Sequence, residues 1–309
     1  MTAKFLTVRK TVAAVAVGGT LLVGTPLVAK AVTSGDPAPT VTAKGATLVD
    51  AESGDSLYGK DADKPRPMAS TAKIMAATVV LDTENLDLDR KVTVRQQYRD
   101  YVTKHHASTA DLQTGDRVTV RQLLYASLLP SGADAAYALA DTFGTGATRA
   151  QRVKSFVGKM NATARRLHLD KTTFGTFDGT RDDSSTPVEL AKLTRHALHN
   201  DTFRKVVGTE KYKGDAPAAN GRTRTYTWTN TNQLLGAYDG AIGIKTGTTE
   251  EAGKCLVFAA TRDGKTLVGT VLNSKDRYQD AAKLLDHGFG SDSAKNLKIR
   301  ELPTGAQQD

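Results

Sequence analysis

The chain has 309 residues, enough for one large domain or two ordinary ones, and its 39% hydrophobic and 24% charged residues are typical of a soluble globular protein. The formal net charge is +9, but beyond the N-terminus the basic residues are scattered without any Lys/Arg run, which argues against a nucleic-acid partner. The only cysteine, Cys255, lies in an apolar run, so an internal disulfide is excluded and a buried structural thiol is expected.

The first 31 residues have the layout of a secretory signal peptide. Lys4, Arg9 and Lys10 precede an uncharged stretch over 11–29, and residues 29–31 form the small-x-small cleavage site Ala-Lys-Ala. We therefore predict a signal peptide and an exported protein. An uncleaved N-terminal membrane anchor is the alternative. No second apolar run has the length to span a bilayer, so the mature chain is expected to have no membrane span.

The folded part is predicted to begin with a β-hairpin. Residues 32–43 have the composition of a linker. Two short apolar segments, 46–49 and 56–58, follow on either side of a polar turn, which indicates the hairpin. Pro65 and Pro67 then break the chain just before a predicted helix.

The middle of the chain is predicted to be helical. Thr119 can cap a helix that Pro130 terminates, and a second helix begins after Ser131 and ends near Gly144. Further on, the segment 186–189 reads Thr-Pro-Val-Glu, which has the pattern of a capping box with proline at the first helical position.

The last third returns to strands. Residues 224–228 alternate between threonine and larger side chains, and a hairpin is predicted from 254–261 and 265–272. A helix over 278–287 follows, and 291–309 is predicted to be a polar tail. This order of strands, helices, strands and helix predicts an α+β fold with one antiparallel sheet, which the first hairpin joins.

Ser70-Thr71-Ala72-Lys73 is the first motif that could carry chemistry. On a helix, residues i and i+3 share a face, so the Ser70 hydroxyl and the Lys73 amine can meet. Serine is a weak nucleophile that needs an adjacent base, and a neutral lysine can serve. Taken alone, a helix start followed by a solvated lysine explains this spacing better.

Two further motifs are individually ambiguous. In Pro130-Ser131-Gly132 a hydroxyl is displayed at a break between helices, although a helix cap would look the same. In Lys245-Thr246-Gly247 a cation and a hydroxyl could hold a terminal carboxylate, and the glycine allows close approach of a bound backbone. A glycine-containing edge strand explains the last segment equally well.

The three motifs together are specific. They follow one another as Ser-x-x-Lys, Ser-Gly-x and Lys-Thr-Gly, a trio typical of class A β-lactamases and penicillin-binding proteins. On this basis the chain resembles the serine-type D-alanyl-D-alanine carboxypeptidases, which are low-molecular-mass penicillin-binding proteins, over residues 44–290. The segments that carry the resemblance are Met68–Lys73, Leu129–Ala136, Asn230–Leu235 and Lys245–Gly247.

The resemblance implies a β-lactamase/transpeptidase-like α+β fold, in which a five-stranded antiparallel sheet is flanked by helices and the active site lies between the sheet and a helical lobe. It implies an extracytoplasmic, cell-wall-associated enzyme that removes the terminal D-alanine from peptidoglycan stem peptides ending in D-Ala-D-Ala. β-Lactams would be its inhibitors. No cofactor and no metal are expected.

The resemblance also implies roles for the catalytic residues. Ser70 would be the acylated nucleophile, Lys73 the general base, and Ser131 the relay of a proton to the leaving D-alanine. One position departs from the family pattern, because Ala133 stands where the family usually has asparagine. An alanine cannot hydrogen-bond the substrate amide or the base.

The third motif is implied to bind substrate. Lys245 and Thr246 would hold the substrate carboxylate, and Gly247 and Thr248 would continue the binding segment. The backbone N–H groups of Ser70 and Thr248 would form the oxyanion hole, in which each donor is commonly worth about 3–4 kcal/mol.

Three other functions remain open at this point. A β-lactamase would need a Glu-x-x-Leu-Asn segment, and the only glutamates between the second and third motifs, Glu189 and Glu210, do not match it. A catalytically weak protein that binds wall peptides or β-lactams is favoured only by Ala133. A metallopeptidase would use histidines such as His196 and His199, but no His-Glu-x-x-His occurs.

Overall fold

A computed structural model describes residues 1–2 and 37–307. The predicted signal peptide and the first part of the predicted linker therefore lie almost entirely outside the described residues. The chain divides into two units, Met1–Lys30 and Ala31–Asp309, and the fold is that of the second unit. Among the helices that the structure describes, none combines the length and the apolar character needed to cross a bilayer.

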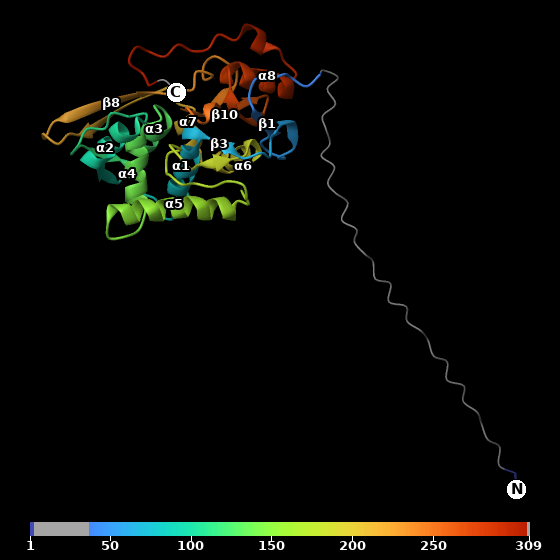
Figure 1. Cartoon of the computed structure of the whole chain (residues 1–309), viewed down its shortest axis with the longest axis horizontal. Coiled ribbons are helices and arrows are strands. Elements are labelled where there is room, and N and C mark those ends of the chain that lie inside the picture. Colours follow the sequence, from blue (N-terminus) through green and yellow to red (C-terminus); the bar gives the residue numbers. More distant parts are fainter. Residues whose placement is uncertain (3–36, 308–309) are drawn as a thin grey trace. The chain divides into compact units, whose positions relative to one another are not determined.

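A five-stranded antiparallel sheet forms the middle layer of the domain (Figure 1). Its strand order is β2-β1-β11-β10-β9, which places β9 at one edge. The N-terminal hairpin joins the C-terminal strands, as predicted, and Thr47 of β1 lies opposite Thr270 of β11. The strands are β1 (Gly45–Asp50), β2 (Ser56–Lys60), β9 (Ala241–Thr249), β10 (Gly253–Arg262) and β11 (Lys265–Ser274).

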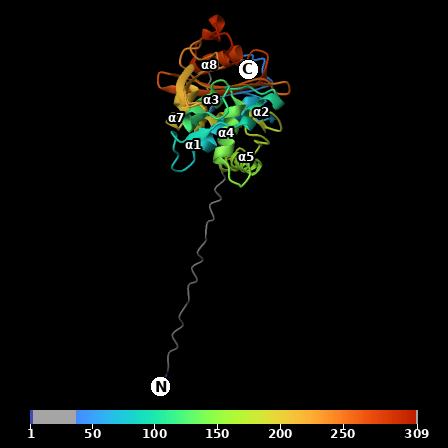
Figure 2. The ribbon, with the colours of Figure 1, turned by 90° about the vertical axis from the view of Figure 1, so that its left-hand side faces the viewer.

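The C-terminal helix α8 (Arg277–Phe289) covers one face of this sheet (Figure 2). Leu284 and Leu285 of the helix are fully buried in one apolar cluster with Phe258 of β10 and Leu48 of β1. Burying side chains of this size stabilises the fold by about 1.5–3 kcal/mol each. The helix thus fixes the sheet from the side opposite the helical lobe.

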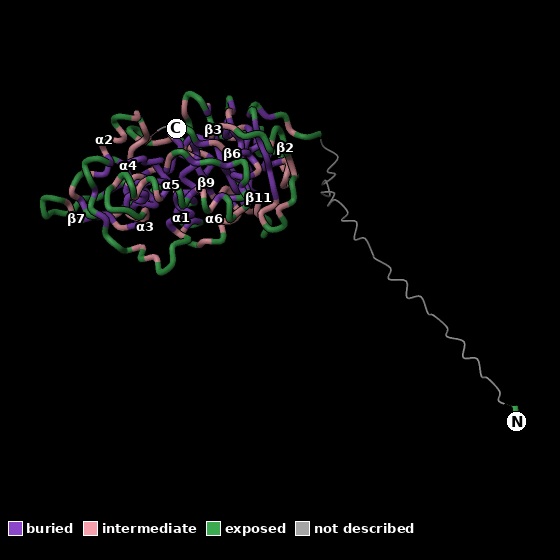
Figure 3. Tube along the Cα trace, turned by 60° about the horizontal axis from the view of Figure 1, so that its bottom comes forward, coloured by how far each residue is buried: buried purple, intermediate pink, exposed green. Residues whose placement is uncertain are grey.

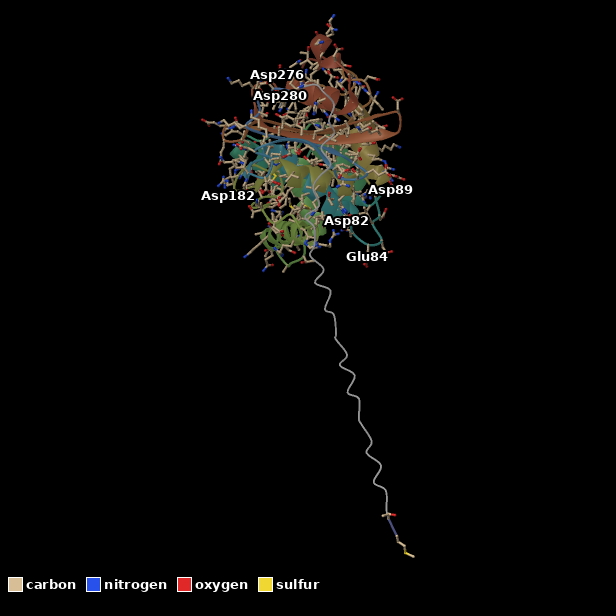
Figure 4. The ribbon with its side chains drawn as sticks, turned by 90° about the vertical axis from the view of Figure 1, so that its right-hand side faces the viewer. Asp82, Glu84, Asp89, Asp182, Asp276 and Asp280 are labelled. Carbon is tan, nitrogen blue, oxygen red and sulfur yellow. The ribbon has the colours of Figure 1, made fainter. Side chains whose placement is uncertain are left out.

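Asp280 at the start of α8 ties down the beginning of the domain. Its carboxylate accepts hydrogen bonds from the N–H groups of Thr42 and Ala43, both at 2.8 Å. Figure 4 labels Asp280 beside Asp276, the N-cap of the helix. Val41 is also buried, so the fold already includes the last residues of the predicted linker 32–43.

The other face of the sheet carries the helices of the lobe. Helix α6 packs on β1, β10 and β11, while α5 is the outermost helix and lies on α1 and α4 (Figure 1). Figure 3 shows the buried interior running through both the sheet and these helices. The helices are α1 (Lys73–Leu81), α2 (Gln96–His105), α3 (Val120–Leu128), α4 (Ala133–Phe143), α5 (Arg149–Arg166), α6 (Pro187–Ala197) and α7 (Asp201–Val207).

Two 3₁₀ turns, four short strands and a separate two-stranded ribbon complete the described part of the domain. They are the 3₁₀ turns η1 (Ala69–Ala72) and η2 (Ser293–Asn296), the short strands β3 (Arg66–Pro67), β4 (Lys91–Thr93), β5 (Arg117–Thr119) and β6 (Ser184–Ser185), and the N-terminal strand of a separate ribbon, β7 (Lys211–Pro217). The ribbon pairs β7 with β8 (Thr223–Thr229). The strand predicted over 224–228 therefore exists, but it lies outside the main sheet.

The predicted helix caps are partly confirmed. Thr119 caps α3 in a complete capping box with Gln122. Thr186 caps α6 by accepting from the N–H of Glu189, but the predicted return bond from Glu189 is wrong. The Glu189 carboxylate instead accepts from Lys171 N–H at 3.0 Å and from Thr172 Oγ1 at 2.5 Å. These two donors come from a neighbouring loop, which the sequence around the helix does not reveal.

The polar C-terminal segment is packed on the domain. Arg300 donates hydrogen bonds to the carbonyl oxygens of Asn230 at 2.6 Å, Asn232 at 3.2 Å and Leu235 at 3.2 Å. The guanidinium thereby satisfies three carbonyl groups of one turn. The segment predicted as a tail is thus attached to the turn that follows β8.

Candidate active site

Ser70 lies in the 3₁₀ turn η1, which runs directly into α1. In such a turn residues i and i+3 eclipse one another, so Ser70 and Lys73 face the same side. Lys73 Nζ donates a hydrogen bond to Ser70 Oγ at 2.8 Å. Thr71 anchors the turn through its hydroxyl, which donates to Met68 O at 2.7 Å. The structure thus brings the serine and the lysine of the first motif together.

Lys73 is almost completely withdrawn from water. Its exposed fraction is 2%, and besides Ser70 its amine donates to the backbone carbonyl of Asp178 at 3.1 Å. Asp178 and Gly179 belong to the loop that precedes β6. A Cβ on Gly179 would lie 1.9 Å from Ala69 O, so only glycine lets this loop approach the turn η1 so closely.

Ser131 lies at the break between α3 and α4, as predicted. Its backbone is in the left-handed region with φ 64°, which is uncommon for a residue other than glycine. The side chain is fully buried, yet its Oγ makes no hydrogen bond within the described residues. Such a hydroxyl costs free energy to bury unless a ligand or water completes it. Among the described residues, Ser131 Oγ is therefore not hydrogen-bonded to Ser70 or Lys73.

Lys245 and Thr246 lie on the edge strand β9 and are buried. Lys245 Nζ donates to Thr246 O at 3.0 Å. The Thr246 and Thr231 hydroxyls are hydrogen-bonded at 2.6 Å, and Thr231 N–H donates to Leu129 O at 3.1 Å. Thr231 therefore links the third motif to the end of the helix that precedes the second motif.

Gly247 is the point where the sheet meets the turn η1, which carries Ser70. A Cβ at this position would lie 2.8 Å from Ser70 N and 3.0 Å from Thr71 N, so any other residue would push the two backbones apart. The next residue, Thr248, is exposed. The edge of β9 therefore runs beside the Ser70 backbone N–H.

A cleft of about 450 Å³ lies beside the first motif, and its lining does not include Ser131 or Lys245–Gly247. Its lining includes Ser70, Lys73 and Thr248, with Gly179 and Thr180 from the loop before β6. The rest of the lining comes from the segment after α2 and the turn after β9, namely His105, His106, Ala107, Ser108, Thr249, Glu250 and Glu251. Two larger hollows, of about 640 and 630 Å³, contain no residue of the three motifs.

Asp134 in the first turn of α4 holds the loop that leads into this cleft. Its carboxylate accepts from Ala110 N–H at 2.9 Å, Leu112 N–H at 3.0 Å and Thr109 Oγ1 at 3.0 Å. Burial raises the pKa of Asp134, while these hydrogen bonds act in the opposite direction. The loop is therefore attached to the helix that follows Ser131.

Ala133 is buried at the start of α4, and its N–H donates to Ser108 O at 2.8 Å. Ser108 lines the cleft, so the backbone of Ala133 supports the cleft wall even though its side chain offers no polar group. The two glutamates considered for a β-lactamase do not line the cleft. Glu189 supports the Lys171–Thr172 backbone instead, and Glu210 lies beside Gly236.

Arg277 was missed by the sequence analysis. It is 4% exposed, and its Nη1 atom donates to Thr248 Oγ1 at 2.9 Å and to Gly247 O at 3.2 Å. It therefore adds a second cation beside β9. The signal in the sequence was weak but real, because a basic residue in the first turn of a helix is unfavourable to the helix dipole and calls for another reason.

Asp183 supports the same loop as Asp178. Its carboxylate accepts from the N–H groups of Gly175 and Thr176 and from the Thr176 hydroxyl. Burial raises the pKa of Asp183 to about 7, and the charge of Asp178 adds to the rise. Because the native pKa exceeds the unfolded one, the native state holds a proton between about pH 4 and 7 that the unfolded state has lost. Stability therefore falls as pH rises through this window.

We expect Asp183→Asn to remove this pH dependence. Between pH 5 and 8 the free energy of unfolding of the unmodified chain should fall by about 2–3 kcal/mol more than that of the variant. The fall is about 1.4 kcal/mol for each pH unit until the native pKa is reached. Urea unfolding at the two pH values measures the difference. Asp182→Asn is the matched control, since Asp182 is the exposed neighbour (Figure 4). Equal pH dependence of the chain and Asp183→Asn would contradict the prediction.

A serine–lysine pair at a helix start, facing the edge of a five-stranded antiparallel sheet, defines the class of serine enzymes with the transpeptidase fold. The family model described as D-alanyl-D-alanine carboxypeptidase, peptidase S11, matches residues 30–276. The chain belongs to this family of serine peptidases.

Individual relatives agree with this assignment. The chain is 51% identical over 257 residues to a D-alanyl-D-alanine carboxypeptidase of Streptomyces sp. strain K15, which covers 81% of this chain and 88% of that protein. It is 36% identical over 263 residues to the D-alanyl-D-alanine carboxypeptidase DacB2 of Mycobacterium tuberculosis, covering 82% and 84%. The crystal structure of the Streptomyces K15 DD-transpeptidase superposes with a TM-score of 0.81 at 52% identity, covering 82% of this chain and 100% of that one.

Proposed function

We propose that this enzyme acts on peptidoglycan peptides ending in D-Ala-D-Ala through an acyl-enzyme on Ser70. The observation that carries the proposal is the 2.8 Å hydrogen bond between Lys73 Nζ and Ser70 Oγ, made inside a cleft beside β9, the edge strand of the sheet. A nucleophilic serine needs a base within hydrogen-bond reach, and Lys73 meets that requirement in the resting enzyme.

The edge strand β9 is suited to hold an extended peptide. Adding a peptide strand along an exposed edge uses backbone hydrogen bonds and places the side chains alternately. A peptide antiparallel to β9 would bring its C-terminal carboxylate toward Lys245 and Thr246. Arg277, which contacts Thr248 Oγ1, contributes further positive charge. The scissile carbonyl would then lie between Ser70 and Thr248.

Acylation is expected to proceed in two stages. Lys73 accepts the proton of Ser70 Oγ while that oxygen bonds to the carbonyl carbon of the penultimate D-alanine, and the backbone N–H groups of Ser70 and Thr248 stabilise the oxyanion. The intermediate then collapses, the C–N bond breaks, and the leaving D-alanine amine receives a proton through Ser131. The buried hydroxyl of Ser131, which has no hydrogen-bond partner in the described part of the chain, supports this relay.

The fate of the acyl group decides between hydrolysis and transfer. Water as acceptor gives carboxypeptidase activity, and an amine of a second peptide gives transpeptidation. The names of the K15 relatives include both activities, so both reactions are proposed for this chain. β-Lactams, whose ring amide resembles the D-Ala-D-Ala bond, are proposed to acylate Ser70 and thus to inhibit the enzyme.

The family acts on cell-wall peptidoglycan, so the enzyme works outside the cytoplasm. We propose that residues 1–31 direct export as a cleaved signal peptide and that the mature enzyme is associated with the wall. An uncleaved anchor is the alternative. Mass spectrometry of the protein recovered from the producing cells gives its N-terminus directly, and a mature chain that begins at residue 1 would contradict cleavage.

The function is tested by mass spectrometry with two reagents. A diacyl tripeptide ending in D-Ala-D-Ala should lose one D-alanine, and in the presence of an amine acceptor part of it should appear as the transfer product. Penicillin should add one adduct to the protein, on the peptide that contains Ser70. If a well-folded protein releases no D-alanine and forms no adduct, the proposal is overturned.

A further inference from the structure

The loop that precedes β6 reaches the base Lys73 through one backbone atom. The carbonyl oxygen of Asp178 accepts from Lys73 Nζ at 3.1 Å, and this bond is buried. The next residue, Gly179, has φ 87° and touches the nucleophile turn at Ala69. Glycine in this region restricts the backbone little, so other contacts must hold the Asp178 carbonyl in place.

The side chain of Asp178 supplies such a contact. It is fully buried, and its Oδ1 atom accepts from the Tyr101 hydroxyl at 3.1 Å and from Thr180 Oγ1 at 3.0 Å. Within the described residues, Tyr101 is the only hydrogen-bond donor to this carboxylate from outside its own loop. The other oxygen, Oδ2, is buried and has no hydrogen-bond partner among residues 37–307, which makes the bonds to Oδ1 the more important ones.

Tyr101 is itself rigidly placed. It lies on α2, and its ring packs against Tyr137 of α4 and Phe177 of the loop, with centroids 5.4 and 5.1 Å apart. Aromatic contacts of this kind fix the ring and therefore the direction of the hydroxyl. The oxygen of that hydroxyl also lies 3.0 Å from Thr180 Oγ1, and Thr180 lines the cleft.

We propose that Tyr101 is a positioning residue for the base. It acts through Asp178: the hydroxyl of Tyr101 holds the carboxylate, and the carbonyl of the same residue holds Lys73 Nζ beside Ser70 Oγ. This inference rests on the proposed function, in which Lys73 is the base that activates Ser70. It adds a residue of α2, outside all three sequence motifs, to the machinery of acylation.

The expected effect is on the rate of acylation and not on substrate binding. Tyr101 makes its hydrogen-bond contacts with Asp178 and Thr180 and not with Lys245 or Thr246 of β9, so the affinity for a β-lactam before bond formation should be unchanged. A base displaced by a fraction of an ångström loses its alignment with the nucleophile, and displacements of about 1 Å can cost about a hundredfold in rate. We expect Tyr101→Phe to lower the acylation rate constant by about 10–100-fold.

The matched control is Tyr137→Phe. Tyr137 belongs to the same aromatic cluster, with its ring against those of Tyr101 and Phe177, but within the described residues it makes no hydrogen bond to Asp178. Both substitutions remove one phenolic oxygen and keep the ring. Stopped-flow measurements with a fluorescent penicillin on the full chain separate the dissociation constant from the acylation rate constant for each variant, and thermal unfolding checks their folding.

The inference requires that Tyr101→Phe lower the acylation rate constant while the dissociation constant and the Tyr137→Phe values stay within about twofold of the unmodified chain. It also requires non-additivity: in an Asp178→Ala background, Tyr101→Phe should cost little more, because both act through one contact. Equal slowing of both phenylalanine variants, or additive effects in the double variant, would overturn it.

If the unmodified chain takes up no penicillin, the proposed function fails and this inference with it. If the unmodified chain is labelled and Tyr101→Phe is labelled equally fast, only the inference fails.

Discussion

A Ser70→Ala variant takes up no penicillin and releases D-alanine at least about a thousandfold more slowly than the unmodified enzyme. The reason is chemical, because the methyl group cannot form the ester on which acyl transfer depends, and removing a nucleophile of this kind leaves only the binding and oxyanion contributions. Ser70 Oγ is the oxygen that Lys73 Nζ contacts at 2.8 Å. Intact-protein mass spectrometry and D-alanine release measure the two losses.

The control for this variant is Ser108→Ala, since Ser108 is the other serine that lines the cleft. It should still form the adduct, because its backbone carbonyl, and not its hydroxyl, accepts from Ala133 N–H. An adduct that persists in Ser70→Ala would show that another residue is the nucleophile. If the adduct then disappears in Ser108→Ala, that residue is Ser108.

The local parts of the fold could be predicted because their signals are local. The polar turn between β1 and β2, the Thr119 cap and the Asp263-Gly264 turn of the β10–β11 hairpin each depend on residues close together in the sequence. That the first hairpin joins the sheet of the last strands was predicted from the order of the elements alone. The placement of β8 was not, because its alternating pattern says that one face is buried but not against what.

The motifs pointed to the proposed nucleophile Ser70 and its proposed base Lys73, but not to the residues that hold them. Thr231 reaches Thr246, Arg277 reaches Thr248, and Tyr101 reaches Asp178 across 77 positions of sequence. Each of these contacts exists only after the chain has folded. A single sequence carries no sign of them beyond an odd feature, such as the cation at the start of α8.

Ala133 also has a contact that the sequence alone could not predict. The family pattern led to an expected loss of a polar contact, and the side chain indeed provides none. The structure adds that the backbone of this residue is used, since its N–H holds the Ser108 carbonyl in the cleft wall. A substitution at this position would therefore act on the wall as well as on the substrate.

Lys245→Met is the second change with a large expected effect. Methionine keeps most of the volume of this buried side chain and removes its charge. For a peptide with a free C-terminal carboxylate we expect kcat/KM to fall by about a hundredfold or more, since removing one partner of a buried charge pair costs about 2–5 kcal/mol. The same peptide with an amidated C-terminus has no carboxylate for the Lys245 charge to bind. For this peptide the variant should differ little from the unmodified enzyme. D-Alanine or D-alaninamide release from the two peptides measures the ratio.

The ratio of the two effects distinguishes the loss of the Lys245 charge from general damage to the site. A misfolded cleft would slow both peptides alike, whereas a lost cation slows the free acid selectively. Lys254→Met is the matched control: Lys254 is exposed on β10, opposite Thr248 in the strand register, so its loss removes the same charge from the same sheet. It should leave both peptides unaffected. If Lys245→Met slows the free-acid and the amidated peptide to the same extent, the substrate carboxylate is held elsewhere, and Arg277 beside Thr248 becomes the next residue to replace.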